Sequence, residues 1–393
     1  MPFASRLDKV ETSAIRELFK LLGRPGIISF AGGFPDSAMF DIEGLRDAST
    51  RALADDPAGA LQYGATEGFG PLRGAIAAHE RAKGAIDMTA EDLIVTTGSQ
   101  QALDLLAKTM IDPGDKVIVE APTFLATIQC FRLYGAELIG APIDAHGVRV
   151  DALEALIAQH RPKLVYLIPS FGNPSGALLS LQRRLQVLEL AARYRTLVVE
   201  DDPYGELYFA DDAPPLSLLA LASEVPGARP WLARCGSLSK VLSPGLRIGW
   251  LAGPAELLAR ATMCKQFSDA HTSTFAQATA AQYLASGRLA PSLDQARRVY
   301  ARRADAMCSA LERHLGDAVR FSRPGGGLFV WARLSDGSDA RHFAARAIAQ
   351  GVAFVPGAPF FADAPDPGCF RLSFATASEE AIAEGVSRLA KAL

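Results

Sequence analysis

Lys240 lies in a run of small and hydroxyl-bearing residues that suits covalent chemistry. A lysine amine attacks an aldehyde only when it is neutral, so a lysine that forms a Schiff base needs burial or neighbouring cations that lower its pKa. Ser237, Ser239 and Arg247 lie close to it in the sequence and offer hydrogen-bond donors for a phosphate dianion. A lone lysine is usually a solvated surface residue, but these neighbours predict an amine that holds a phosphate cofactor covalently.

Two further polar residues, Asn173 and Asp201, each follow an apolar run that is typical of a buried strand. Open parallel sheets bind ligands beyond the carboxyl ends of their strands. Asn173, Asp201 and Lys240 are therefore expected to meet in one cleft, although 28 and 39 residues separate them in the sequence. A carboxylate at the end of a buried strand also needs a cationic partner. The alternative for Asp201 is a loop carboxylate that bonds the backbone of the next turn.

Two other patterns predict anion binding. Gly98, Ser99 and Gln100 lie between an expected strand and the start of a helix, where backbone N–H groups and the helix dipole favour an anion. The alternative for this segment is an ordinary helix cap. Arg371 is a cation in an otherwise apolar strand, and its planar guanidinium can bind a substrate carboxylate through two hydrogen bonds. The alternative is an arginine that faces solvent from an amphipathic strand.

The pattern of apolar runs predicts an α/β protein with two domains. Between about residues 91 and 250, short apolar runs alternate with helical stretches, which predicts a mostly parallel sheet. The expected strands are 93–96, 116–120, 164–168, 196–200 and 231–235. Beyond about residue 286, the expected elements are helix 293–315, strands 327–332, 352–355 and 370–374, and helix 379–389. This second set is typical of a smaller α+β domain, and 393 residues are enough for two hydrophobic cores.

The run Ser-x-Ser-Lys-x-x-x-Pro-Gly-Leu-Arg-x-Gly-Trp at residues 237–250 resembles the signature of fold-type-I aminotransferases, which hold pyridoxal 5'-phosphate (PLP) on this lysine. The resemblance covers about residues 13–387, and the segment 28–35 together with Arg16 makes it greatest to the α-aminoadipate, kynurenine and aromatic aminotransferases. It implies the PLP-transferase fold type I, with a large domain and a smaller α+β domain built from both termini. Residues 1–44 are expected to join the small domain, 45–285 to form the large PLP-binding domain, and 286–393 to form the small C-terminal domain.

The resemblance also implies roles for individual residues. Lys240, Asp201 and Tyr204 match catalytic residues: Asp201 would keep the pyridine nitrogen protonated, while Tyr204 and Asn173 would bond the phenolic oxygen of the cofactor. The residues expected to bind the cofactor are Gly98, Ser99, Gln100, Phe124, Asn173, Asp201, Tyr204, Ser237, Ser239, Lys240 and Arg247, with Tyr63 supplied by a neighbouring subunit. The residues expected to bind the substrate are Arg371, Asn173, Arg16 and Gly33. No metal is expected.

The composition argues against several classes of protein. Lys and Arg number 40 and Asp and Glu 43, so the net charge of -3 gives no overall attraction to nucleic acid or to anionic membranes. No run approaches the ~20 apolar residues of a membrane span, and the N-terminus lacks the apolar core of a signal peptide. The five cysteines are scattered, which favours unpaired thiols in a reducing compartment. We therefore expect a cytoplasmic enzyme that binds neither nucleic acid nor a membrane.

The predicted function is transamination between an L-amino acid and 2-oxoglutarate by a homodimer. The expected donors are 2-aminoadipate and aromatic or large apolar amino acids, because in the similar enzymes the arginine that matches Arg16 lies on a segment that closes over the substrate side chain. Arg16 also lies beside the apolar stripe of a helix expected over residues 13–22, which equally suits a solvated face. A PLP-dependent β-lyase or decarboxylase would use the same residues and is the alternative. A non-catalytic PLP sensor is a third interpretation, and the expected lack of a DNA-binding domain argues against it.

Overall fold

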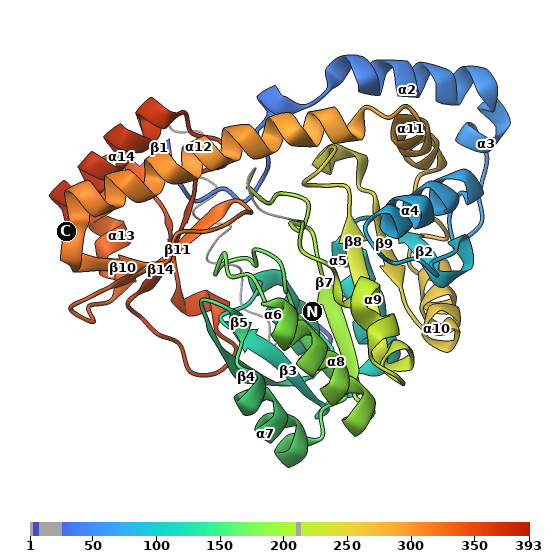
Figure 1. The fold of residues 1–393 in the computed structure, drawn as a ribbon, viewed down its shortest axis with the longest axis horizontal. Coiled ribbons are helices and arrows are strands. Elements are labelled where there is room, and N and C mark those ends of the chain that lie inside the picture. The colour runs from blue at the N-terminus through green and yellow to red at the C-terminus, as the bar shows by residue number, and fades with distance from the viewer. Residues whose placement is uncertain (1–2, 8–25, 210–213) are drawn as a thin grey trace.

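The larger lobe of the protein is built on an eight-stranded sheet (Figure 1). The structure is a computed structural model that describes residues 3–7, 26–209 and 214–393. The strands are ordered β2-β9-β8-β7-β6-β3-β4-β5; β8, β7, β6, β3 and β4 run parallel, whereas β9 and β5 are antiparallel to their neighbours. The bounds are β2 Leu93–Thr96, β3 Lys116–Ala121, β4 Glu137–Asp144, β5 Gly147–Val148, β6 Leu164–Leu167, β7 Leu197–Asp201, β8 Leu232–Ser237 and β9 Gly249–Ala252. The predicted mostly parallel sheet is confirmed.

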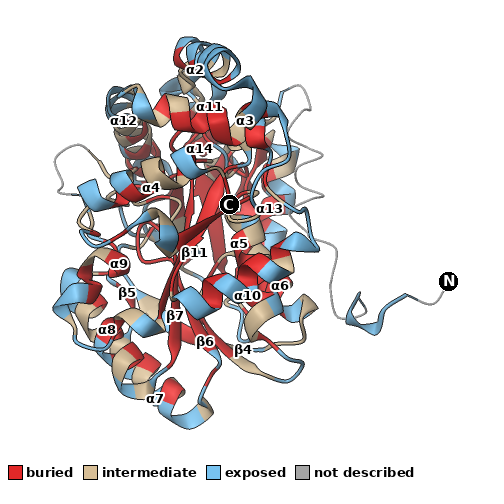
Figure 2. Ribbon diagram, turned by 90° about the vertical axis from the view of Figure 1, so that its right-hand side faces the viewer, coloured by how far each residue is buried: buried red, intermediate tan, exposed pale blue. Residues whose placement is uncertain are grey.

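Helices cover both faces of this sheet, which explains why its central strands are apolar along their length (Figure 2). β2, β6, β7 and β8 are buried at every residue, as expected where both faces of a parallel sheet are covered. On one face α6 and α10 pack against α5, and on the other α7 and α9 pack against α8. The bounds are α5 Ser99–Met110, α6 Leu125–Leu133, α7 Val150–His160, α8 Leu181–Tyr194, α9 Leu218–Leu221 and α10 Ala255–Gln266.

The smaller lobe contains a four-stranded antiparallel sheet, ordered β10-β11-β14-β13, and a parallel pair formed by β1 and β12. α14 packs against both α12 and α13, and α12, which is 27 residues long, extends from this lobe toward α11 (Figure 1). The bounds are β1 Ile28–Ser29, β10 Val319–Phe321, β11 Phe329–Leu334, β12 Val352–Ala353, β13 Val355–Pro356, β14 Cys369–Ser373, α12 Leu289–Leu315, α13 Ala340–Ala349 and α14 Glu379–Ala392. The β1–β12 pair brings an N-terminal segment against the C-terminal part of the chain.

A further group of helices packs around α11 at one end of the large sheet (Figure 1). α2, α3 and α4 each contact α11. The bounds are α2 Ile42–Asp55, α3 Pro57–Leu61, α4 Gly70–Ala82 and α11 Thr274–Ala285. Within the described ranges, no helix combines the length and the apolar character needed to cross a membrane.

The observed strands differ from the predicted ones in two ways: one predicted strand is divided, and several short or irregular strands were not predicted. The strand expected over 352–355 is two short strands: β12 pairs with β1, whereas β13 pairs with β14 in the other small sheet. The expected set also lacked β1, β4, β5, β9 and β10. The longest of these, β4, is only partly buried and carries Gly140 and Pro142, residue types that are depleted in strands. The strand propensity of these residues therefore argues against β4, but its pairing with β3 stabilises the strand.

Candidate active site

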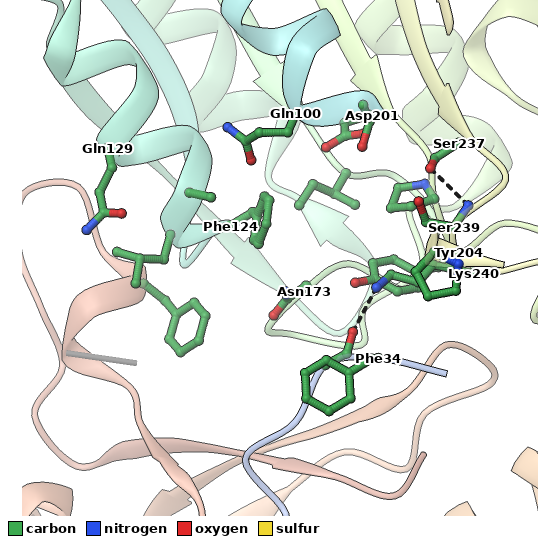
Figure 3. Close-up of a pocket in the computed structure, with 18 of the residues that line it drawn as sticks. Phe34, Gln100, Phe124, Gln129, Asn173, Asp201, Tyr204, Ser237, Ser239 and Lys240 are labelled. Carbon is green, nitrogen blue, oxygen red and sulfur yellow. Dashed lines mark hydrogen bonds between the residues drawn. The ribbon is translucent and has the colours of Figure 1, made fainter. Parts of the chain in front are cut away.

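One cavity gathers most of the predicted site residues at the carboxyl ends of the large sheet's strands (Figure 3). Its volume is about 390 Å³, which lies within the range of about 300–1,000 Å³ that is typical of small-molecule sites. The lining residues are Gly33, Phe34, Ser99, Gln100, Phe124, Leu125, Ala126, Gln129, Ile168, Asn173, Asp201, Pro203, Tyr204, Ser237, Ser239, Lys240, Pro244, Arg247, Phe360 and Arg371. Both lobes contribute to this list, so the cavity lies between them.

Lys240 follows the end of β8 by three residues and points into the cavity (Figure 3). Its Nζ donates a hydrogen bond to the backbone carbonyl of Gly33 at 2.8 Å, which joins the N-terminal segment to the large sheet. Burial lowers the pKa of the Lys240 amine to about 8, and the neighbouring cations Arg371 and Arg247 act in the same direction. A lysine with this pKa is partly neutral near physiological pH, the state in which an amine acts as a nucleophile or a base.

Asp201 is the last residue of β7, and its carboxylate is buried where the strand meets the cavity. Its Oδ2 accepts a hydrogen bond from the Tyr166 hydroxyl at 2.6 Å. Its Oδ1 is buried and has no hydrogen-bond partner among the residues that the structure describes. Burial raises the pKa of this carboxyl to about 7. An unpaired, buried carboxylate oxygen at a cavity wall suits a cationic N–H group on a ligand, such as a protonated pyridine nitrogen.

The start of α5 suits a ligand anion, in contrast to Asp201, which suits a cation. Gly98 precedes α5 with a φ of +80°, and no side chain caps this helix end. Arg247 lies against Gly98, so closely that a Cβ on the glycine would clash with the guanidinium. Ser237 and Ser239 lie on the same wall, and the Ser239 backbone N–H donates to Ser237 Oγ at 3.1 Å (Figure 3). An uncapped helix N-terminus beside an arginine and two serines suits a phosphate dianion.

Arg371 lies in β14 of the small lobe and is 3% exposed, which excludes the interpretation that it faces solvent. Its guanidinium donates to Asn173 Oδ1 and to the backbone carbonyl of Ala31, each at 2.7 Å, and it stacks on the Phe329 ring at 4.4 Å. Its Nε is buried without a partner among the described residues. Burial lowers the pKa of Arg371 to about 10, so it remains a cation. A buried guanidinium with a spare donor suits a substrate carboxylate.

Three more predicted residues shape the cavity between these groups. Phe124 immediately precedes α6, and Asn173 follows β6 (Figure 3). The amide oxygen of Asn173 accepts a hydrogen bond from Arg371. Tyr204 lies three residues after Asp201; its ring packs edge-on against Phe329, and burial raises the pKa of its phenol above the usual range. The phenol therefore stays protonated and can donate a hydrogen bond to an anionic ligand oxygen.

The remaining predicted residues are not part of the cavity wall. Gly98 lies behind the wall, against Arg247. Tyr63 is 86% exposed and contacts the His271 ring edge-on at 5.7 Å rather than the cavity. Arg16 lies outside the described residues. Every other residue expected to bind cofactor or substrate lines the same cavity.

The sequence motifs did not point to several lining residues. Leu125, Ala126 and Gln129 follow Phe124 on the first turns of α6. Their helical spacing from Phe124 could have predicted that they lie near it. Phe34, Phe360 and the buried Tyr166 carried no such signal, because register and loop packing place them at the site. Among the described residues, no group of three or more His, Cys, Asp or Glu could hold a metal ion.

Comparison with known proteins gives concordant results. The family model described as aminotransferase class I and II matches residues 27–389. The chain is 43% identical over 391 residues to the 2-aminoadipate transaminase of Thermus thermophilus, covering 100% of this chain and 96% of that protein. It is 40% identical over 397 residues to aromatic-amino-acid aminotransferase 1 of Thermococcus litoralis, covering 100% and 94%. Its structure matches the crystal structure of the Thermus thermophilus α-aminoadipate aminotransferase complexed with N-(5'-phosphopyridoxyl)-L-leucine with a TM-score of 0.91, at 42% identity and covering 100% and 97% of the two chains.

Proposed function

The chain belongs to the family of class I and II aminotransferases, and we propose that it moves an amino group from 2-aminoadipate, or from an aromatic or large apolar L-amino acid, to 2-oxoglutarate. It is a fold-type-I aminotransferase that uses PLP. The observation that supports the site assignment best is that one cavity brings together Lys240, the unpaired Oδ1 of Asp201 and the buried guanidinium of Arg371.

The residues of the cavity fit PLP. Asp201 Oδ1 suits the protonated ring nitrogen, and the start of α5 with Arg247 suits the phosphate. When bound there, PLP supplies an electron sink that stabilises negative charge at the substrate α-carbon. Arg371 would hold the α-carboxylate, and Lys240 Nζ would take the proton from that carbon. A positioned base of this kind contributes roughly 10²–10⁴-fold in rate.

The substrate end of the cavity supports a preference for large side chains. Phe34, Leu125 and Phe360 line the cavity and give it apolar surface. Gln129 adds an amide on the side opposite Lys240 (Figure 3). A long apolar or aromatic side chain can bury its surface there. The distal carboxylate of 2-aminoadipate needs a cation as well, and we propose Arg16 for this contact because of the resemblance to the aminoadipate and kynurenine enzymes.

The proposed function is tested by assaying the purified protein with 2-oxoglutarate and a panel of donors. We expect 2-aminoadipate, phenylalanine and leucine to yield glutamate and the matching 2-oxo acid. Aspartate, which is short and dicarboxylic, is expected to be a poorer donor. Release of ammonia or CO₂ in place of glutamate would instead favour the lyase or decarboxylase alternative, which the relatives' activities do not favour.

Substitution Arg16→Gln is expected to lower kcat/KM for 2-aminoadipate by about ten- to a hundredfold, because a hydrogen bond between charged groups contributes roughly 1.5–3 kcal/mol. Phenylalanine and leucine should react as with the wild type. Arg46→Gln is the matched control, because Arg46 is exposed on α2 and pairs with Glu43. Equal losses on both classes of donor in the Arg16 variant would show that Arg16 does not contact the distal carboxylate.

We also propose that the enzyme is a homodimer in which Tyr63 reaches the cofactor phosphate of the partner subunit. The support is a cluster of exposed apolar and aromatic residues near Tyr63, which includes Leu61 of α3 and Phe275 of α11. Monomeric proteins rarely leave such a patch uncovered. Tyr63→Phe is expected to speed PLP loss during dialysis, and light scattering is expected to give twice the chain mass of 41.7 kDa. Full activity at the mass of one chain would contradict the shared site.

Two broader expectations remain proposals. The division into residues 1–44 with the small domain, 45–285 as the large domain and 286–393 as the small domain is supported by the pairing of β1 with β12. A cytoplasmic location is supported by the five cysteines, all of which are free thiols. Expression with a fluorescent tag in the source cell would test the location.

A further inference from the structure

Tyr166 is a buried tyrosine whose hydroxyl meets Asp201 rather than the cavity. Its side chain on β6 is 0% exposed, and its hydroxyl donates to Asp201 Oδ2 at 2.6 Å. Phe131 of α6 packs edge-on against the phenol, with ring centroids 5.9 Å apart. A hydroxyl buried in such surroundings is unfavourable without a partner, so the bond to Asp201 explains why a tyrosine rather than a phenylalanine occupies this position.

The sheet itself sets the geometry of this contact. β6 and β7 are adjacent parallel strands, and Tyr166 pairs with Val199. Asp201 lies two residues beyond Val199, so its side chain is on the same face, about 6.6 Å further along the strand. The phenol spans that rise and reaches from inside the sheet to the carboxylate at its edge. Two rigid strands therefore hold donor and acceptor in place.

Because of this contact, the two carboxylate oxygens of Asp201 have different surroundings. Oδ2 is occupied by the Tyr166 hydroxyl. Oδ1 is buried, lacks a partner among the described residues, and belongs to a residue that lines the cavity. With one oxygen held, the plane of the carboxylate cannot rotate freely, and the other oxygen is kept available for a ligand.

The electrostatic surroundings also give Tyr166 a specific effect on Asp201. The titratable and charged groups around Asp201 are Glu120 of β3, Tyr166 of β6, Glu200 and Asp202 on either side of Asp201 itself, Tyr204 in the loop after β7, and Arg234 and Cys235 of β8. Burial raises the pKa of Asp201, and the acids Asp202 and Glu200 raise it further. The Tyr166 hydrogen bond is the largest effect in the opposite direction, ahead of the charge of Arg234.

We propose that Tyr166 is a positioning residue for transamination: by donating to Asp201 Oδ2, it keeps Asp201 ionised and its Oδ1 directed at the pyridine nitrogen of PLP. This inference rests on the proposed role of Asp201. Without the tyrosine hydroxyl, the proton shared between the ring nitrogen and Oδ1 moves toward the carboxylate. The ring then withdraws fewer electrons, and the nitrogen that links the cofactor to Lys240 becomes more basic.

Tyr166→Phe in the PLP-loaded enzyme tests this proposal, because it removes one oxygen and retains the ring that packs on Phe131. The pH midpoint of the visible absorbance change of the Lys240-bound cofactor should move upward by about one pH unit, since a hydrogen bond to a charged group is worth about that much in pKa. In single turnovers with a saturating amino donor, proton transfer should slow by about tenfold. KM should change little, because Arg371 and not Tyr166 is proposed to hold the substrate.

A matched control exists elsewhere in the molecule. The hydroxyl of Tyr283, a buried residue of α11, donates to Asp41 Oδ2 at 3.0 Å, and neither residue lines the cavity. Tyr283→Phe removes an equivalent tyrosine–aspartate hydrogen bond and should leave both the pH midpoint and turnover unchanged. A shift in this variant as well would assign the effect to general loss of stability and overturn the proposal.

A double-mutant cycle tests whether Tyr166 acts through Asp201. In an Asp201→Asn background, Tyr166→Phe should cause no further shift of the absorbance midpoint, because the proposed effect of Tyr166 passes through the charge of Asp201, which the first change has already removed. Independent, additive shifts would overturn the proposal, as would an unchanged midpoint in a Tyr166→Phe enzyme that binds PLP. If Tyr166→Phe abolished folding, the hydroxyl would serve stability alone, which a loss of the apoprotein's thermal transition would reveal. The single variant Asp201→Asn separates the two claims. If its absorbance midpoint equals that of the wild type, the role proposed for Asp201 fails; if its midpoint shifts and that of Tyr166→Phe does not, only the inference about Tyr166 fails.

Discussion

Lys240→Ala is expected to reduce transamination below detection while the protein still binds PLP non-covalently. The amine lies in the cavity, hydrogen-bonded to the Gly33 carbonyl, and burial lowers its pKa to about 8. No other lysine lines the cavity, so within the described residues there is no nearby amine to replace it. Removing a positioned base costs roughly 10²–10⁴-fold, and loss of the covalent link adds to that cost.

Two measurements check this result. Steady-state assays with 2-aminoadipate and 2-oxoglutarate should show the loss of turnover, and borohydride reduction of the wild type should place a pyridoxyl group on the peptide that contains Lys240. Lys163→Ala is a suitable control, because Lys163 is half-exposed and its ion pair with Asp115 lies at 3.5 Å on the surface. A pyridoxyl label on another lysine would refute the assignment.

The large sheet and the cofactor end of the cavity could be predicted because they depend on local sequence. The Ser-x-Ser-Lys run, the strand that precedes Asp201 and the glycine before α5 each combine a strand or helix signal with a chemically suited residue. The carboxyl-end rule for parallel sheets then brings distant residues together without any knowledge of their contacts. Ten of the residues predicted to bind the cofactor, from Ser99 to Arg247, line one cavity for this reason.

The parts that escaped prediction depend on register and on packing between lobes. Tyr166 is an aromatic residue within a buried, mostly apolar run of sequence. Only the alignment of β6 with β7 shows that its hydroxyl reaches Asp201. Phe360 enters the cavity wall from a three-residue 3-10 helix beyond β13, which is too short to show a periodic pattern. Tyr63 faces outward from the single chain, so its proposed role needs a second subunit that one sequence does not describe.

Asp201→Asn is the second change for which we expect a large effect. Asparagine retains the shape and can still accept the Tyr166 hydroxyl, so PLP should bind, but the charge that favours a protonated ring nitrogen is gone. Removing one preorganised electrostatic contact in an enclosed site costs roughly 10²–10³-fold in kcat. Rapid-mixing measurement of the first half-reaction, with 2-aminoadipate and the PLP-loaded variant, should show this loss. Wild-type rates in that experiment would mean that Asp201 does not face the ring nitrogen.

The same substitution should have the opposite effect on the stability of the apoprotein. Burial raises the pKa of Asp201 from 3.8 to about 7, so the native apoprotein binds a proton that the unfolded chain has already released between those values. The ionised carboxylate therefore destabilises the native state increasingly as pH rises from about 4 to about 7, and Asp201→Asn should relieve this by roughly 1–3 kcal/mol above pH 7. Urea unfolding at several pH values measures the difference in the free energy of unfolding, which should vanish below pH 4.

Asp41→Asn provides the contrast. Pairing with Arg288 and Tyr283 holds the pKa of Asp41 well below its usual range, so removal of the Asp41 carboxylate should lower stability at neutral pH. A stabilising change at Asp201 that also slows catalysis would indicate that the carboxylate is retained for the cofactor and not for the fold.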